Sequence, residues 1–311
     1  MTLISRLNFK IRRLKQVESP KSAKSKDVSI VIPVKNNQKG INTYLEHFFK
    51  THTKESFPRE IIIIDNNSIP KIHIQEEHKK NGIIRLIECE KIGPASARNK
   101  GIKIAKGNWI LFNDSDCLPT ESLISGYLNV LNGSVAYAGN VKSLGDDKLS
   151  QYYESQEILL PLKTSHDFVP QYLITANAFV WREAINKTGG FNENIKVASG
   201  EDVDLGLRLS QIGRLSYAFE SVVFHNFDDG FSGFIKRFRR YGKGNKIVSE
   251  LYKTDVKPRP FRPNEKSITN YFLAIIQYLS LTYGYYFDWK SVNYSKIKIK
   301  NGIYTEGVSK Q

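Results

Sequence analysis

Four short apolar runs constrain the fold of this chain more than any other feature of its sequence. They occupy residues 28–32, 61–64, 83–87 and 109–112, and polar stretches with helical spacing separate them. In the clearest of these stretches, at 41–49, the apolar residues recur at intervals that place them on one helix face. Continuously apolar strands that alternate with helices predict an α/β fold, in which helices flank a mostly parallel, Rossmann-like sheet on both faces.

Carboxylates follow the ends of two of these runs. Asp65 comes directly after the second run, and Asp114 and Asp116 follow the fourth. Residues two apart in an extended segment point to the same side, so this last pair would concentrate negative charge in one place. Such a pair favours a bound cation, although Asn-Asp-Ser-Asp is also good turn chemistry. Because open α/β sheets bind ligands beyond the carboxyl ends of their strands, we expect all three aspartates on one rim.

A second acidic pair opens a later helix. The stretch GEDVDLGLRLSQIG at 200–213 has helical apolar spacing, with Ser199 as a candidate cap and a glycine stop. Glu201 and Asp202 fall in its first turn, where the helix dipole alone favours carboxylates. His225 ends another apolar run, where a lone histidine is commonly structural. Combined with the rim aspartates, these side chains can hold a divalent ion, a nucleotide and a general base.

The charge balance narrows the possible partners. Lys and Arg number 46 against 31 Asp and Glu, so the formal charge of +15 indicates an anionic partner: a nucleotide, a nucleic acid or an anionic membrane surface. The sequence lacks glycine-rich dinucleotide and P-loop fingerprints, so phosphates must be held in another way. Two cysteines cannot form a disulfide framework in 311 residues, and the first residues lack the apolar core of a secretory signal. We therefore expect a reducing, cytoplasmic location.

Both ends of the chain carry basic, amphipathic patterns. Residues 1–15 predict a basic helix that either meets a membrane or docks on the protein itself, and residues 16–26 have the composition of a linker. Residues 231–241 set aromatic side chains among basic ones, which fits either a membrane interface or packing on the catalytic domain. Residues 267–287 carry no charge but several polar side chains, so a packed helix, an interfacial helix and a membrane span stay open.

These patterns divide the chain into three parts. We expect an N-terminal segment with its linker at 1–26, a catalytic domain at 27–228 and a basic helical region at 229–311. The spacing within the catalytic domain further predicts a helix ending near 107, a helix over 121–131, strands over 134–138 and 172–181, and an irregular polar loop over 142–170.

Five motifs, in order along the chain, resemble those of glycosyltransferase family 2, whose members have the GT-A fold. They are VSIVIPVKNN (28–37), IIIIDNNS (61–68), GPASARNKGIKIAKGNWILFNDSD (93–116), ANAFVWREAINKTGGFNE (176–193) and GEDVDLGLRL (200–209). Each motif is weak by itself, and the shared order makes the resemblance specific. It covers the chain from about residue 27 to about residue 245.

The resemblance implies a role for each matching residue. Asp202 would be the catalytic base, with Glu201 beside it toward the acceptor, and Asn177 and Trp181 would flank the acceptor or sugar pocket. Mn²⁺ or Mg²⁺ would bind Asp114, Asp116 and His225. The donor nucleotide would contact Pro33, Val34, Asn36, Asp65, Arg98, Asn113, Asp114 and Ser115. Arg98 fits a buried salt bridge equally well, and Trp181 fits core packing.

The chemistry of these residue types agrees with the implied roles. A hard divalent ion held by one or two carboxylates and by phosphate oxygens stabilises a departing diphosphate. A carboxylate on the opposite side of the sugar takes the proton of the attacking hydroxyl. One displacement with one base inverts the anomeric configuration, whereas a double displacement would need a second carboxylate as nucleophile.

The predicted function is therefore an inverting, metal-dependent hexosyl- or N-acetylhexosaminyl-transferase. It would use a nucleotide-sugar, with UDP favoured by the family, and a glycan or lipid-linked acceptor in surface polysaccharide or glycolipid synthesis at the inner face of the cell membrane. Asn66 and Lys91 depart from the family pattern and leave the base and sugar of the donor open. The alternatives are a nucleic-acid-binding protein, against which the absence of recognised modules argues, and a catalytically silent nucleotide-sugar scaffold.

Overall fold

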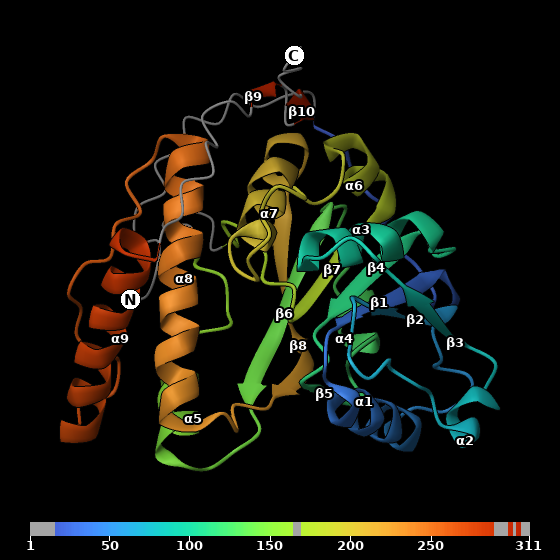
Figure 1. Ribbon diagram of the computed structural model, residues 1–311. Coiled ribbons are helices and arrows are strands. Elements are labelled where there is room, and N and C mark those ends of the chain that lie inside the picture. The colour runs from blue at the N-terminus through green and yellow to red at the C-terminus, as the bar shows by residue number, and fades with distance from the viewer. Residues whose placement is uncertain (1–15, 164–168, 289–297, 301–302, 306–311) are drawn as a thin grey trace.

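An eight-stranded sheet runs through the centre of the protein in this computed structural model, which describes residues 16–163, 169–288, 298–300 and 303–305 (Figure 1). The strand order is β3-β2-β1-β4-β7-β6-β8-β5. The predicted helix over residues 1–15 lies outside the described residues. Two long helices stand side by side at one edge of the molecule, drawn in orange and red in Figure 1.

The four apolar runs form the parallel half of the sheet, as the sequence predicts. They are β1 (Val28–Val34), β2 (Glu60–Asp65), β3 (Ile84–Glu88) and β4 (Trp109–Asn113). Val34 of β1 pairs with Asp65 of β2, so the carboxyl ends of neighbouring strands lie at one rim. The sheet therefore brings the ends of separate motifs together at that rim.

The other half of the sheet is mixed in direction. It contains β5 (Cys117–Pro119), β6 (Ala136–Ser143), β7 (Asn177–Trp181) and β8 (Leu215–His225). Strand β7 is antiparallel to both β4 and β6, β6 is parallel to β8, and β5 is antiparallel to β8. A separate two-stranded sheet pairs β9 (Lys298–Lys300) with β10 (Ile303–Thr305).

Helices cover both faces of the sheet. They are α1 (Gln38–Thr51), α2 (Glu76–Lys79), α3 (Pro94–Ile104), α4 (Ser125–Leu128), α5 (Lys148–Ser155), α6 (Arg182–Thr188), α7 (Glu201–Ile212), α8 (Gly230–Tyr252) and α9 (Ile268–Tyr286), with a 3₁₀ turn at Ser25–Asp27. Alternating residues of β1 face opposite layers: Ile30 packs in the core that includes α1, and Val31 in the core that includes α3 and α7. Each fully buried side chain of this size contributes about 1.5–3 kcal/mol to folding.

Several sequence predictions need correction. The helix expected over 121–131 is only the short α4, and the strand expected over 172–181 begins at Asn177. The stretch at 142–170 contains the end of β6 and all of α5, where Asp147 caps the helix by accepting from two backbone N–H groups. The residues that read as a linker pack on the catalytic domain, since Ser19 is buried and donates to the carbonyl of Ser134 at 2.7 Å.

The aromatic face of α8 packs on the catalytic domain. Phe234 and Phe238 are fully buried, and Phe234 lies 5.5 Å from Tyr153 of α5, centroid to centroid. Residues 231–241 were predicted either to meet a membrane interface or to pack on the catalytic domain, and the structure supports packing on the catalytic domain.

Two glycines let α9 lie directly against α8. A Cβ atom at Gly242 would collide with the carbonyl of Leu281, and one at Gly284 with the carbonyl of Arg239. No helix in the described part of the chain combines the length and the apolar character needed to cross a bilayer.

Candidate active site

A cleft of ≈ 560 Å³ opens beyond the carboxyl ends of the parallel strands. One wall comes from the end of β1, the loop after β4 and the start of α3, and the other from the start of α7 and from α8. Asp116 and Asp202, far apart in the sequence, line this one cavity together. The sites predicted from separate motifs therefore meet in space.

Arg98 of α3 joins the two acidic motifs. Its Nη1 donates to Glu201 Oε1 and its Nη2 to Asp114 Oδ1, both at 2.8 Å. The guanidinium is buried and also stands over the Phe191 ring, 5.6 Å from its centroid. Because the Arg98 guanidinium pairs with one carboxylate from the loop after β4 and one from α7, it fixes these two segments relative to each other. The salt-bridge role foreseen for Arg98 is the one that the structure shows.

The acids around Arg98 are hard to ionise together. Burial raises the pKa of Glu201, and the neighbouring Asp202 adds to this rise, while Arg98 opposes it. Burial also raises the pKa of Asp202, again partly offset by Arg98. One Asp202 oxygen accepts from the Val203 N–H at 2.8 Å. A carboxylate with a raised pKa is a stronger proton acceptor than a solvated aspartate, which suits a general base.

Strand pairing brings His225 to Asp116. Strand β5 follows Asp116 directly and pairs antiparallel with the end of β8, where Cys117 opposes His225. His225 Nε2 consequently lies 3.3 Å from Asp116 Oδ2, and the imidazole stacks on Phe227 at 4.4 Å between centroids. Burial lowers the pKa of His225 although Asp116 opposes the shift. The neutral imidazole that results is the form that binds metal ions.

The donor set of this corner fits a divalent metal. Asp114 and Asp116 keep 33% and 43% of their side chains exposed to the cleft, and His225 adds a nitrogen beside Asp116. Among the residues that the structure describes, no group of three His, Cys, Asp or Glu side chains is already gathered around one point. Mg²⁺ and Mn²⁺ take only one or two protein carboxylates and fill their other positions with substrate phosphate and water, so the two exposed aspartates supply a sufficient number of protein oxygens.

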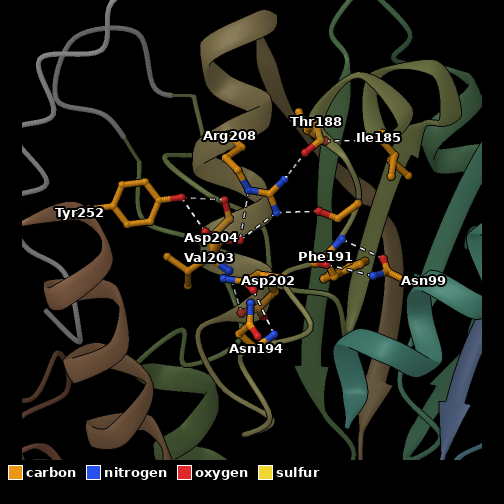
Figure 2. Close-up of polar contacts among 12 residues, drawn as sticks. Asn99, Ile185, Thr188, Phe191, Asn194, Asp202, Val203, Asp204, Arg208 and Tyr252 are labelled. Atoms are coloured by element: carbon orange, nitrogen blue, oxygen red, sulfur yellow. Dashed lines mark hydrogen bonds and ion pairs between the residues drawn. The ribbon is translucent and has the colours of Figure 1, made fainter. Parts of the chain in front are cut away.

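A buried network that sequence reasoning missed holds α7 in place (Figure 2). Arg208 and Asp204 are fully buried and paired at 2.8 Å, and Arg208 also donates to the carbonyls of Thr188 and Gly190. The Tyr252 hydroxyl of α8 donates to Asp204 Oδ1 at 2.7 Å. The available signal was an acid and a base four residues apart within the apolar part of a helix.

The cap of α7 is Gly200, not the predicted Ser199. Gly200 has φ +92°, which an L side chain rarely adopts, and a Cβ there would also lie 3.1 Å from the Gly244 carbonyl of α8. The glycine lets the first turn of α7, with Glu201 and Asp202, approach α8 closely.

Two of the predicted nucleotide contacts, Asp65 and Asn36, form hydrogen bonds within the surrounding loops. The buried Asp65 carboxylate accepts from the N–H groups of Ser68 and Ile72, and Asn36 accepts from the Ile69 N–H. Neither residue lines the cleft. Pro33, Val34, Arg98, Asp114 and Ser115 of the same predicted set do line it.

The structure explains why Asn66 departs from the family pattern. Its amide donates to the carbonyls of Cys89 and Lys91 and accepts from the Gly93 N–H. An ionised aspartate could accept the last of these bonds but could not donate the other two. Asn66 therefore shapes the loop that enters α3, and it lines the cleft itself.

Three other predicted residues do not line the cleft. Asn113 is buried between Tyr44 and the Ala176 carbonyl, and Asn177 is buried among hydrogen bonds that include one from the Tyr127 hydroxyl. Trp181 lies at the opposite end of β7, paired with Trp109. The structure thus brings none of them to the cleft lining.

Helix α8 supplies cleft residues that sequence reasoning did not assign. Arg237, Arg240, Tyr241 and Asn245 all line the cavity. Arg237 is buried, paired with Asp229 at 2.7 Å and placed over the Phe227 ring that supports His225. The basic-aromatic pattern of 231–241 signalled an amphipathic helix, but only the folded chain shows that one side of it faces the cleft.

Comparison of the sequence with known proteins identifies relatives. The model of the family described as glycosyl transferase family 2 matches residues 29–189. A pre-mycofactocin glycosyltransferase of Mycobacterium tuberculosis is 29% identical over 237 residues, covering 72% of this chain and 47% of that protein. Glycosyltransferase AglE of Haloferax volcanii is 27% identical over 229 residues, covering 70% of this chain and 72% of that protein. The chain thus spans about half the length of the mycobacterial relative.

Solved structures share the architecture at low sequence identity. The mannosyltransferase PcManGT from Pyrobaculum calidifontis, in complex with GDP-Man and Mn²⁺, has a TM-score of 0.52 at 14% identity, covering 88% of this chain and 77% of that one. GalNAc-T7 with UDP, GalNAc and Mn²⁺ has a TM-score of 0.53 at 15% identity, covering 80% of this chain and 54% of that one. At these identities the likeness concerns the fold.

Proposed function

Because the chain belongs to glycosyl transferase family 2 and has the GT-A fold, we propose that its cleft transfers a sugar from a nucleotide-sugar to a hydroxyl group of a glycan or lipid-linked acceptor. The observation that carries this proposal is the double ion pair of Arg98 with Asp114 and Glu201. It holds an acidic donor corner and the start of α7 next to each other in one cavity, as a transfer reaction between two substrates requires.

The donor would lie along the end of β1 and the start of α3. Pro33, Val34, Asn66 and Ser115 line this side, where backbone and polar groups are within reach of a nucleoside diphosphate. Two solved structures of the same fold are complexes with GDP-Man and with UDP and GalNAc, which supports a nucleotide-sugar donor in general. We propose UDP as the carrier and a hexosyl or N-acetylhexosaminyl group as the sugar.

Asp114, Asp116 and His225 would hold Mn²⁺ or Mg²⁺ at the diphosphate end of the donor. When bound, the ion supplies positive charge that stabilises the departing diphosphate. The presence of Mn²⁺ in both related complexes supports this assignment. Lys35 and Lys196 also line the cleft and add positive charge for an anionic donor.

Asp202 would be the general base, and Glu201 would position it. Both residues line the cleft, but Glu201 is buried and bound to Arg98, so it would fix the first turn of α7, and the less buried Asp202 would meet the acceptor. Asp202 would accept the proton of the acceptor hydroxyl as that oxygen attacks the anomeric carbon and the diphosphate leaves. A single displacement of this kind inverts the anomeric configuration.

Donor binding tests the metal corner. Thermal unfolding should shift upward with UDP and Mn²⁺ added together, since a ligand at 100 times its Kd contributes about 2.7 kcal/mol of stability. Asp116→Ala should remove most of this shift, because it deletes an oxygen ligand and leaves His225 without its partner. A GDP series run in parallel decides the nucleobase.

The matched control for that experiment is Asp146→Ala. Asp146 is an exposed carboxylate outside the cleft, so its loss changes the net charge equally but should leave the nucleotide shift intact. An undiminished shift in Asp116→Ala would contradict the metal assignment, and the absence of any shift with both nucleotides would contradict the donor assignment.

The pH dependence of transfer tests the base. The pKa of Asp202 is raised, so its carboxylate is lost to protonation at a higher pH than for a solvated aspartate. We expect kcat/KM to fall about tenfold per pH unit on the acid side of that pKa. Because Arg98 lowers the pKa of Asp202, Arg98→Met should move the acid limb to higher pH.

Lys100→Met is the control for the pH experiment. Lys100 lies on the same helix as Arg98 but is exposed and outside the cleft lining, so the same loss of one positive charge should leave the limb in place. If the acid limb of the kcat/KM profile of Arg98→Met stays at the wild-type pH, a group other than Asp202 is the one that titrates. The expected location at the inner membrane face and the role in surface polysaccharide or glycolipid synthesis stay predictions.

A further inference from the structure

One face of α9 exposes a continuous apolar stripe. Eight large apolar residues along the helix and at its end are between 41% and 93% exposed: Ile268, Tyr271, Phe272, Ile275, Leu279, Tyr283, Tyr286 and Phe287. Most recur at intervals of three or four residues, so they lie on one side of the helix. A stripe of this extent on a folded surface marks an interaction site.

The opposite face of α9 already has its partner. Leu273, Leu281 and Tyr285 are buried on the side that packs on α8, where the glycine contacts bring the two backbones together. Phe231 at the start of α8 is itself 43% exposed and stacks on Phe272 at 6.2 Å, which extends the stripe onto α8. Packing on α8 thus accounts for the apolar residues on the inner face of α9, but not for those on its outer face.

The segment that carries this stripe is strongly basic. Residues 230–287 contain eleven Lys and Arg against three Asp and Glu, a surplus of eight within a whole-chain charge of +15. Two of the three acids are engaged within the segment, Glu250 by Lys246 and Asp255 by Arg259. Five of the basic residues, from Lys253 to Lys266, lie in the connector that leads into α9.

We propose that the outer face of α9 docks on an anionic lipid bilayer, with the helix lying in the plane of the membrane surface. Apolar side chains would enter the boundary between headgroups and acyl chains, while the cations of the connector meet lipid phosphates. The three tyrosine rings of the stripe, at 271, 283 and 286, are side chains that favour this boundary.

Charge distinguishes this partner from a second copy of the chain. Pairing two α9 faces would bring two segments of like charge together, and like charges across an interface oppose association. An anionic membrane instead attracts each Lys or Arg near its surface by about 1 kcal/mol. The combination of an apolar stripe and a cationic surround therefore favours lipid.

The docked face lies one helix away from the catalytic cleft. Arg239 and Gly242 of α8 contact α9, while Arg237, Arg240 and Tyr241 of the same helix line the cavity. Docking through α9 would thus hold the cleft close to the bilayer. The inference itself rests on the surface of α8 and α9 and is independent of the reaction in the cleft.

Vesicle co-sedimentation tests the proposal. The full chain should sediment with phosphatidylcholine vesicles containing one-third phosphatidylglycerol and much less with phosphatidylcholine alone, and 1 M salt should weaken binding because it shortens the screening length to about 3 Å. The triple variant Phe272→Gln, Ile275→Gln, Leu279→Gln should bind the anionic vesicles at least about tenfold more weakly.

A matched triple variant controls for the loss of exposed apolar surface. Ile69→Gln, Leu144→Gln and Phe219→Gln remove three exposed apolar side chains outside α8 and α9, and vesicle binding should persist. Equal binding by both triple variants would overturn the proposal. So would light scattering that shows a dimer in the wild type and a monomer in the α9 variant, with vesicle binding unchanged. Donor binding in the cleft, measured by the nucleotide shift, should be the same in all three proteins.

Discussion

Asp202→Asn is expected to lower kcat by about 10²–10⁴ while nucleotide binding stays near the wild-type level. The substitution keeps the size of the side chain and its acceptance of the Val203 N–H, but an amide cannot take a proton from an attacking hydroxyl. The substitution also removes a negative charge beside Arg98 and Glu201. The cleft then repels the anionic donor less, so donor binding should not weaken.

The measurement combines single-turnover transfer from a radiolabelled nucleotide-sugar with the nucleotide-dependent thermal shift. Asp228→Asn is the matched control, since Asp228 is exposed on the loop before α8 and does not line the cleft. Retained turnover in Asp202→Asn would remove Asp202 as the base. A wild type that binds nucleotide without any transfer, across a panel of acceptors, would instead favour the silent scaffold.

Arg208→Met is expected to lower the free energy of unfolding by about 3–5 kcal/mol. The substitution leaves the Asp204 carboxylate fully buried without its guanidinium partner, and it strips the carbonyls of Thr188 and Gly190 of a donor. The Tyr252 hydroxyl would still donate to Asp204, but as a neutral donor it cannot replace the guanidinium charge. Because the same network fixes α7, the remaining folded protein should also turn over more slowly.

Urea unfolding measures the loss, and a double variant interprets it. Asp204→Leu with Arg208→Met removes both charges, so it should be more stable than Arg208→Met alone, although the two carbonyls still lack their donor. Lys79→Met is the control: it breaks an exposed ion pair with Glu76 and should cost less than about 1 kcal/mol. A double variant less stable than the single one would show that packing, not an unpaired charge, dominates.

The parallel half of the fold follows from local sequence pattern. Strands β1, β2 and β4 are runs of side chains that are almost all buried, the edge strand β3 is partly buried, and α1 repeats its apolar residues at helical spacing. The rule that ligands bind beyond the carboxyl ends of such strands correctly placed Asp114 and Asp116 at a cleft. These predictions succeed because the formation of each strand or helix depends on residues that are close together in the sequence.

Strand direction is a property that the pattern cannot supply. An apolar run at 172–181 predicts a strand, but only pairing with β4 shows that β7 is antiparallel. Its first residue, Asn177, therefore lies toward the rim and its last residue, Trp181, at the far edge beside Trp109. The proximity of His225 to Asp116 and the bridge made by Arg98 likewise depend on contacts between residues distant in the chain.

The contact between Gly200 and Gly244 bears on how this protein can be re-engineered. The α8 backbone at Gly244 occupies the space that a side chain at position 200, just before α7, would need. A chimera that grafts foreign C-terminal helices onto this catalytic sheet must reproduce that backbone approach, or the carboxylate pair next in the chain will be misaligned. A domain exchange in this protein should therefore keep α7 and α8 together in one piece.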